Sequence, residues 1–176
     1  MKKILLSTLL TIATSLLSFG QNYVHVSYKN IQLKSFKGWE TTTNDFPYLN
    51  SEGHFISLQA PAGDGAESFS LTWVPQNSRV TISDAITQNR KDLLKFIEEH
   101  GLKGYTTFSI ISDTKIRGYQ AKTFDIKISV EDTVIHKKVI IWEENGYQIS
   151  IEKSGGMTRD KFLTYYKDIE SSIVIK

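Results

Sequence analysis

The four histidines are the residues of this chain best suited to metal binding or acid–base chemistry. They are His25, His54, His100 and His136. No two are spaced as His-x-His or His-x-x-x-His, so no single strand or helix presents two imidazoles to one ion. The chain has no cysteine, which excludes a thiol nucleophile and thiolate ligands. We expect no metal site and no cofactor site from local motifs, while a site assembled from distant histidines stays open.

Three short motifs resemble catalytic or ligand-binding loops without their full pattern. Ser154–Gly156 lacks the spacing of a nucleophile elbow and indicates a strand-to-helix turn. Gly63–Gly65 lacks the lysine, third glycine and repeated acids of phosphate and calcium loops, which favours a hairpin turn. Glu143 and Glu144 are neighbours on a predicted strand, so their carboxylates point to opposite faces. We therefore predict no catalytic residue.

The aromatic residues are the strongest candidates for a binding surface. Tryptophan and tyrosine are enriched at binding hot spots, but they are also ordinary core residues with one polar atom. The candidate surface consists of Trp39, Trp73, Tyr119, Trp142 and Tyr147, with Tyr105 beside them. A core role is favoured over a pocket, and Trp39 is the residue most expected to be partly exposed.

The charge balance argues against a nucleic-acid partner. The chain carries 21 Lys and Arg residues against 19 Asp and Glu. Two of the lysines fall in the first 20 residues, so the rest of the chain has no formal net charge. Proteins that bind nucleic acid usually carry a basic excess that neutralises phosphates. A length of 176 residues favours one domain.

Residues 1–20 have the pattern of a secretory signal peptide. Two lysines follow the initial methionine, a leucine-rich apolar stretch covers 4–17, and small residues precede the end at Gly20. A membrane anchor is the alternative, but it needs about 20 apolar residues, more than this stretch offers. Gln21 stands where a lipoprotein would need cysteine. We predict cleavage before Gln21, which leaves one exported domain, 21–176, without a membrane anchor.

The first half of that domain alternates short strands with turns. Strands are predicted over 23–28, 31–36, 54–60 and 69–74. Residues 37–39 indicate a turn that carries Trp39. Residues 41–54 are polar and contain Pro47 and Gly53, so they are predicted to form a loop.

A helix is predicted from Ile82 to His100. Thr81 and Asp84 have the spacing of a capping pair, and Gly101 suits a left-handed C-terminal cap. The apolar stripe consists of Ile82, Ala85, Ile86, Leu93, Leu94, Phe96 and Ile97.

The second half reads as a strand meander followed by a helix. Strands are predicted over 108–111, 119–130, 134–142 and 147–152. A change of apolar phase indicates a bulge near Thr123, and Asn145–Gly146 is typical of a two-residue hairpin turn. A second helix begins after Thr158 and carries Phe162, Tyr165, Tyr166 and Ile169 on one side; 173–175 is a short extended end. The expected class is α+β, an antiparallel meander covered by two main helices.

This order, with the residues at its joints, resembles the PsbP-like fold group, which includes Mog-type, DcrB-type and LpqN-type proteins. The matching pieces are Phe36–Trp39, the helix that ends in Gly101, Thr114–Ala121, and the closing series Phe162, Tyr166, Ile169 and 171–173. The resemblance implies an α/β/α sandwich and a non-catalytic binding or accessory role. No residue here matches the metal or photosystem sites of the photosynthetic branch, so those roles do not carry over.

The sequence therefore predicts an exported, non-catalytic binding or accessory protein of the bacterial envelope or extracellular space. Its expected partner is a protein or a small apolar ligand. One alternative is a carrier of a lipid or other apolar ligand, which needs an internal void of at least about 300 Å³. The other is a hydrolase whose residues converge from separate strands, which needs a pocket with at least two titratable groups of shifted pKa.

Overall fold

The computed structural model describes residues 23–176 except 50, 62–66, 78 and 131. The predicted signal peptide, with its cleavage point between Gly20 and Gln21, lies outside the described residues, as does most of the predicted turn at 61–65. Among the helices of the described part, none has the length and hydropathy that a membrane crossing requires.

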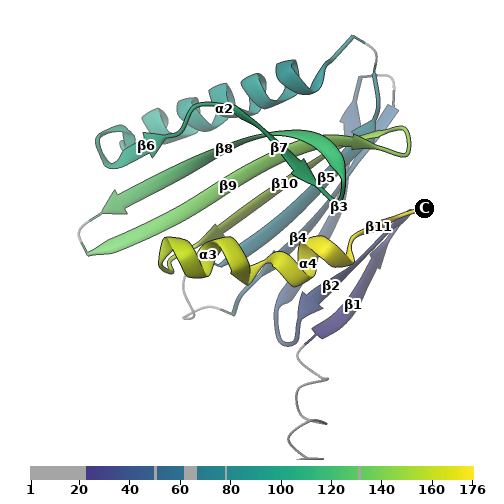
Figure 1. Cartoon of the computed structure of the whole chain (residues 1–176), viewed down its shortest axis with the longest axis horizontal. Coiled ribbons are helices and arrows are strands. Elements are labelled where there is room, and N and C mark those ends of the chain that lie inside the picture. Colours follow the sequence, from purple (N-terminus) through teal and green to yellow (C-terminus); the bar gives the residue numbers. More distant parts are fainter. Residues whose placement is uncertain (1–22, 50, 62–66, 78, 131) are drawn as a thin grey trace, which may run out of the picture.

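An eight-stranded sheet forms the centre of the molecule (Figure 1). Its strands lie in the order β3-β4-β5-β10-β9-β8-β6, and β7 also pairs with β8. The bounds are Glu40–Tyr48 (β3), Ser51–Gln59 (β4), Ser68–Pro75 (β5), Thr106–Phe108 (β6), Ser112–Ile116 (β7), Tyr119–Val130 (β8), Thr133–Glu144 (β9) and Tyr147–Gly155 (β10). Every strand pair is antiparallel, which confirms the predicted α+β class.

The turn between β9 and β10 forms at Asn145–Gly146, as predicted. Both residues have positive φ, 51° and 79°, which is the requirement of a type I′ turn. The turn sets the register in which β10 pairs with β9. On its other side β10 pairs with β5, so it lies in the middle of the sheet.

The predicted loop at 41–54 is wrong, because these residues form most of a hairpin. Strands β3 and β4 pair from Glu40 opposite Gln59 to Tyr48 opposite Ser51. The segment is polar because β3 is an edge strand with an exposed outer side, where proline is also tolerated. The polar composition of this segment was interpreted as a loop, but it also suits the exposed side of an edge strand.

The predicted bulge near Thr123 is also wrong. Strand β8 pairs with β9 in one unbroken register from Ala121 to Val130. The apolar phase changes because the buried side changes along the strand: Ala121 packs on one side near its start, and Phe124 and Ile126 pack on the other side farther along. The strand predicted at 108–111 is displaced, because β6 covers Thr106–Phe108 and shares only Phe108 with it. Ser112–Ile116 adds β7, which the sequence pattern did not indicate.

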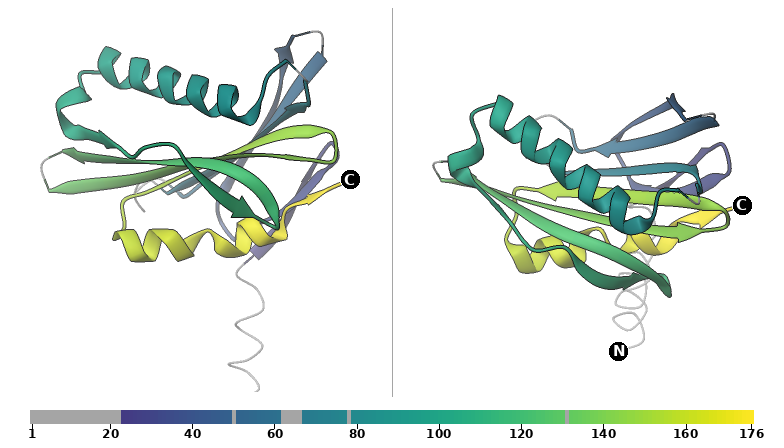
Figure 2. Two further views of the ribbon diagram at one scale, coloured as in Figure 1. Left: turned by 45° about the horizontal axis from the view of Figure 1, so that its top comes forward. Right: turned by 90° about the horizontal axis from the view of Figure 1, so that it is seen from above.

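Helix α2 spans Ile82–Glu99 and lies against one face of the sheet (Figure 2). The predicted capping box is present, with Thr81 Oγ1 accepting from the Asp84 N–H at 3.1 Å and Asp84 Oδ2 accepting from the Thr81 N–H at 3.1 Å. Gly101 has a φ of 70° and ends the helix as predicted. The helix contributes to a small cluster of buried residues, Ile86, Ile97, Phe124, Ile126, Val139 and Ile141.

Phe96 does not belong to the buried stripe, contrary to the sequence prediction. Its side chain is 53% exposed, and its ring lies 4.1 Å from the ring of His100, one helical turn away. At 100° per residue, Phe96 lies about 80° from Ile86 around the helix axis, so it points away from the sheet.

The opposite face of the sheet is covered by two short helices and a second, three-stranded sheet (Figures 1 and 2). The helices are α3, Arg159–Tyr165, and α4, Lys167–Ser172, and the small sheet contains β1, Tyr23–Tyr28, β2, Ile31–Phe36, and β11, Val174–Ile175. Thr158 occupies the N-cap position of α3, but its side chain makes no capping hydrogen bond. The expectation of two main helices as the whole cover is therefore incomplete.

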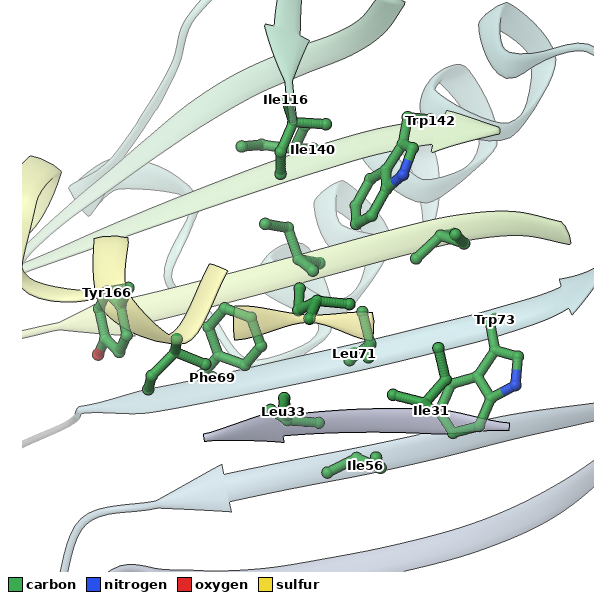
Figure 3. Packing of buried hydrophobic residues seen from close by; sticks show 14 of the residues in the cluster. Ile31, Leu33, Ile56, Phe69, Leu71, Trp73, Ile116, Ile140, Trp142 and Tyr166 are labelled. Atoms are coloured by element: carbon green, nitrogen blue, oxygen red, sulfur yellow. The ribbon is translucent and has the colours of Figure 1, made fainter. Parts of the chain in front are cut away.

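A large cluster of buried residues fills the space between these layers (Figure 3). Trp73, Trp142 and Tyr166 are its largest members and are fully buried. Residues from both sheets meet there, since Ile31 and Leu33 of β2 join Ile56, Phe69 and Leu71 of the main sheet. This face of the sheet is closed by packing along most of its length.

Candidate functional site

The aromatic residues singled out in the sequence do not form one surface. Trp73 and Trp142 have no exposed area and belong to the large cluster. Trp39 is half-buried, with its ring 4.9 Å from Phe36, and Tyr147 packs against the same cluster from its edge. Tyr119 is exposed at the β7–β8 hairpin. These residues mostly build the core, the reading that the sequence favoured.

A hollow lies elsewhere, between α2 and the part of the sheet that α2 leaves uncovered. It has a volume of about 530 Å³ and opens to solvent. Its apolar lining comes from Phe46, Tyr48, Val74, Ala85 and Ile141. We call this hollow the α2 groove. Its size is in the range of ordinary ligand sites.

The floor of the groove depends on a glycine in strand β4. Phe46 of β3 lies directly opposite Gly53, and a Cβ at Gly53 would sit 2.4 Å from Phe46 Cζ. No side chain other than hydrogen leaves room for the ring there. Both residues fall in the segment that sequence reasoning assigned to a loop, so this wall of the site was missed.

The wall of the groove formed by α2 is polar, because polar residues recur along the helix at a spacing that places them on one side. A polar residue recurs every fourth position, at Asp84, Gln88 and Asp92, and Asn89 directly follows Gln88. This spacing places them on one face of α2, and all four line the groove. The pattern was readable in the sequence as a polar stripe beside the apolar one.

The groove offers hydrogen-bond acceptors and no cation. Neither Lys nor Arg is among its lining residues in the described part of the chain. One oxygen of Asp84 accepts from Thr81, and one oxygen of Asp92 accepts from Gln88 Nε2 at 2.8 Å. The second oxygen of each carboxylate has no hydrogen-bond partner among the described residues. Asn89 Oδ1 is buried and equally without one.

A hydrogen bond from the Thr81 hydroxyl at 2.7 Å, and then one from the Thr81 N–H, lower the pKa of Asp84 from its ordinary value. Its carboxylate is therefore ionised at neutral pH, and it contributes negative charge to the groove. The same hydrogen bonds stabilise the start of the helix, so the lowered pKa needs no catalytic explanation. Among the described residues, no histidine lines the groove.

A second group of polar residues joins the small sheet to the main sheet. Asp45 accepts hydrogen bonds from Tyr28 Oη at 2.7 Å and His54 Nδ1 at 2.7 Å, and it pairs with Lys29 Nζ at 2.9 Å. These three bonds, with that of His54 the strongest, hold the pKa of Asp45 well below its usual range. We call this group the Asp45 junction.

The Asp45 junction has the ligand types of a metal site. Donor atoms of Asp45, Glu52 and His54 lie within 4.8 Å of one another. The ammonium of Lys29 already sits among them, 2.9 Å from Asp45 and 3.6 Å from Glu52, and it supplies the positive charge. These carboxylates and the histidine therefore form a structural network of ion pairs around Lys29. This network was not predicted from the sequence.

Glu143 and Glu144 point to opposite sides, as expected of neighbours on a strand. Glu143 accepts from Gln76 Nε2 at 2.7 Å near the surface. Glu144 is buried and accepts from Arg117 Nη1 and Trp142 Nε1, both at 3.0 Å. The two carboxylates thus have separate structural partners.

No protein-family model matches the sequence, and no curated protein matches it. Among solved structures, the chain is similar to cyanobacterial PsbP (CyanoP) from Synechocystis sp. PCC 6803, with a TM-score of 0.56 and 16% identity over 89% of this chain and 94% of that one. It is also similar to the Ran-binding protein Mog1p of Saccharomyces cerevisiae, with a TM-score of 0.48 and 10% identity over 89% of this chain and 96% of that one.

The similarity to CyanoP shows that this chain has the PsbP-like fold, which confirms the resemblance seen in the sequence. At 16% identity the likeness concerns the fold alone. Function has to be argued from the groove and its neighbouring residues.

Proposed function

We propose that this chain is a non-catalytic binding protein, exported to the envelope or the extracellular space, that holds a segment of a partner protein in the α2 groove. The observation that carries the proposal is a hollow of about 530 Å³ with an apolar floor and a rim of unpaired acceptors. The PsbP-like fold is compatible with this role but does not assign it.

The chemistry of the groove specifies the partner segment. An apolar side chain fits against Phe46, Val74 and Ala85, while a lysine or arginine beside it reaches Asp92 on the helix wall. A cation bound there forms charge-assisted hydrogen bonds with oxygens that have no other partner among the described residues. We therefore expect a partner segment in which an apolar residue adjoins a basic one.

A carrier of an apolar ligand is the alternative. The volume of the α2 groove is large enough for one. Its rim, however, presents two carboxylates and a buried amide oxygen, and a purely apolar ligand would leave these acceptors unpaired. The cost of such unpaired groups favours a ligand that donates hydrogen bonds.

Site-specific photo-crosslinking in the source organism tests this proposal. A photoreactive residue at Gln88, which lines the groove, should form one discrete adduct with a protein. The same residue at Lys91, exposed on α2 but outside the groove lining, should not. Asp92→Lys should remove the Gln88 adduct by repelling a basic segment.

Equal adducts from both positions, or a Gln88 adduct that survives Asp92→Lys, would contradict the proposal. An adduct with a lipid in place of a protein would support the carrier. Export is tested separately, by mass spectrometry of the chain recovered from the cell envelope and the medium. We expect Gln21 as the first residue, and an intact residue 1 would refute the export proposal.

A further inference from the structure

A second hollow, separate from the α2 groove, lies between α3, the strands β8 and β9, and the connection that follows β6. Its volume is about 280 Å³, close to the lower end of small-molecule sites. We call it the α3 pocket. None of the residues that line it lines the α2 groove.

Two cationic side chains and a histidine, from three elements, meet in the α3 pocket. Lys127 of β8 lies directly opposite His136 of β9 in the strand register, and Arg159 enters from the start of α3. Lys127 and Arg159 form no ion pair with any described residue. The pKa of His136 is lowered by burial and then by the charges of Lys127 and Arg159, which shows that both cations act on the same place.

The other charged residues of the pocket are already paired. Lys137 pairs with Glu152 at 2.5 Å, and Asp125, the one carboxylate in the lining, pairs with Lys138 at 3.2 Å. The carboxylate is thus paired, and the two cations Lys127 and Arg159 remain without a counter-charge among the described residues.

One wall of the pocket is apolar. Phe162 and Leu163 of α3 and Phe108 of β6 line it, and the ring of Phe162 lies 5.9 Å from the ring of His136. Leu163 is 45% exposed although it is a large apolar residue. An apolar group of a ligand would cover these side chains.

The geometry points to a binding site in the α3 pocket for a small organic oxyanion, a phosphate or carboxylate that carries one aromatic or short alkyl group. Arg159 binds the oxyanion through paired N–H donors, which suit two oxygens of such a group. Lys127 adds a second positive charge, the neutral His136 imidazole offers one hydrogen bond, and the apolar wall holds the ring or chain. The site is independent of the proposed function of the groove.

Isothermal titration calorimetry with phenyl phosphate tests the site on the purified protein. We expect binding by phenyl phosphate, weaker binding by inorganic phosphate, and none by phenol. Arg159→Ala and Lys127→Ala should each weaken phenyl phosphate about tenfold, the loss of one charge-assisted contact. Lys161→Ala is the matched control, because Lys161 is exposed on α3 but does not line the pocket.

Three results would overturn the inference. Phenol binding as tightly as phenyl phosphate would show apolar contact alone. An equal loss with Lys161→Ala would show general surface charge. Binding to phosphatidylglycerol vesicles without binding to phenyl phosphate would identify a membrane surface as the anion source. Arg159 and Lys127 are both exposed, so circular dichroism should confirm that the variants fold.

Discussion

The two faces of the main sheet differ in how completely they are covered. One face is closed by α3, α4 and the small sheet over the large cluster of Trp73, Trp142 and Tyr166. The other has only α2 and the small cluster around Ile86 and Phe124, and the α2 groove opens where that helix stops covering the strands. The closed face holds the larger buried cluster, while the other face keeps the groove that we propose as the partner site.

Neighbouring residues of β5 give the largest contrast between the faces. Trp73 is fully buried in the large cluster and donates to Asn30 Oδ1 at 3.0 Å. Trp73→Ala should cost about 3–5 kcal/mol of unfolding free energy. Thr72→Val, one residue away on the groove face, should change it by about 0.5 kcal/mol or less. Urea denaturation measures both, and similar losses would remove the contrast.

The adjacent glutamates of β9 give a second, smaller contrast. Glu144→Ala leaves Arg117 and the Trp142 indole N–H without their acceptor, at a cost of about 1–3 kcal/mol. Glu143→Ala removes one exposed hydrogen bond and should cost about 0.5 kcal/mol or less. Denaturation curves that rank Glu143→Ala as the more harmful would show that the strand faces are misassigned.

Acid should remove the stabilisation that the Asp45 junction gives to the fold. The folded pKa of Asp45 lies below its unfolded value, so its stabilising effect is present above about pH 4 and is lost as the pH falls further. Asp45→Asn should lower the melting temperature at pH 7 and make its decline below about pH 4 shallower. Glu52→Gln is the control, since its contacts are longer, at 3.6 Å and 3.9 Å. An unchanged acid profile in Asp45→Asn would refute the role of the junction.

The groove residues should matter least for stability. Asp92→Asn keeps the size of the side chain and removes an exposed charge, so the unfolding free energy should change by about 0.5 kcal/mol or less. The same variant should weaken capture of the partner, because the cation loses its counter-charge. A large loss of stability with normal capture would reverse the roles of the two faces.

The sequence predicted those elements whose pattern has one physical explanation. Asn145–Gly146 requires positive φ, and the Thr81–Asp84 spacing requires a helix start, so both predictions are confirmed. Residues 41–54 and the phase change near Thr123 each had two explanations. A polar edge strand resembles a loop, and a strand whose buried side changes along its length resembles a bulged one.

The candidate site was harder to predict because it depends on contacts between distant segments. Phe46 reaches the groove only because Gly53 lies opposite it in β4. Trp73 and Trp142 were candidate binding residues by type, but both lie on the strand face that packs into the core. Residue type identified aromatic candidates, whereas exposure depended on which face each strand presents.

Hydrogen exchange of the protein with and without its crosslinked partner tests the central claim most directly. The account predicts added protection in two segments, Phe46–Tyr48 of β3 and Asp84–Asp92 of α2, which form the walls of the groove. Protection confined to the turn at Trp39 and the hairpin at Tyr119, with the groove walls unchanged, would contradict it.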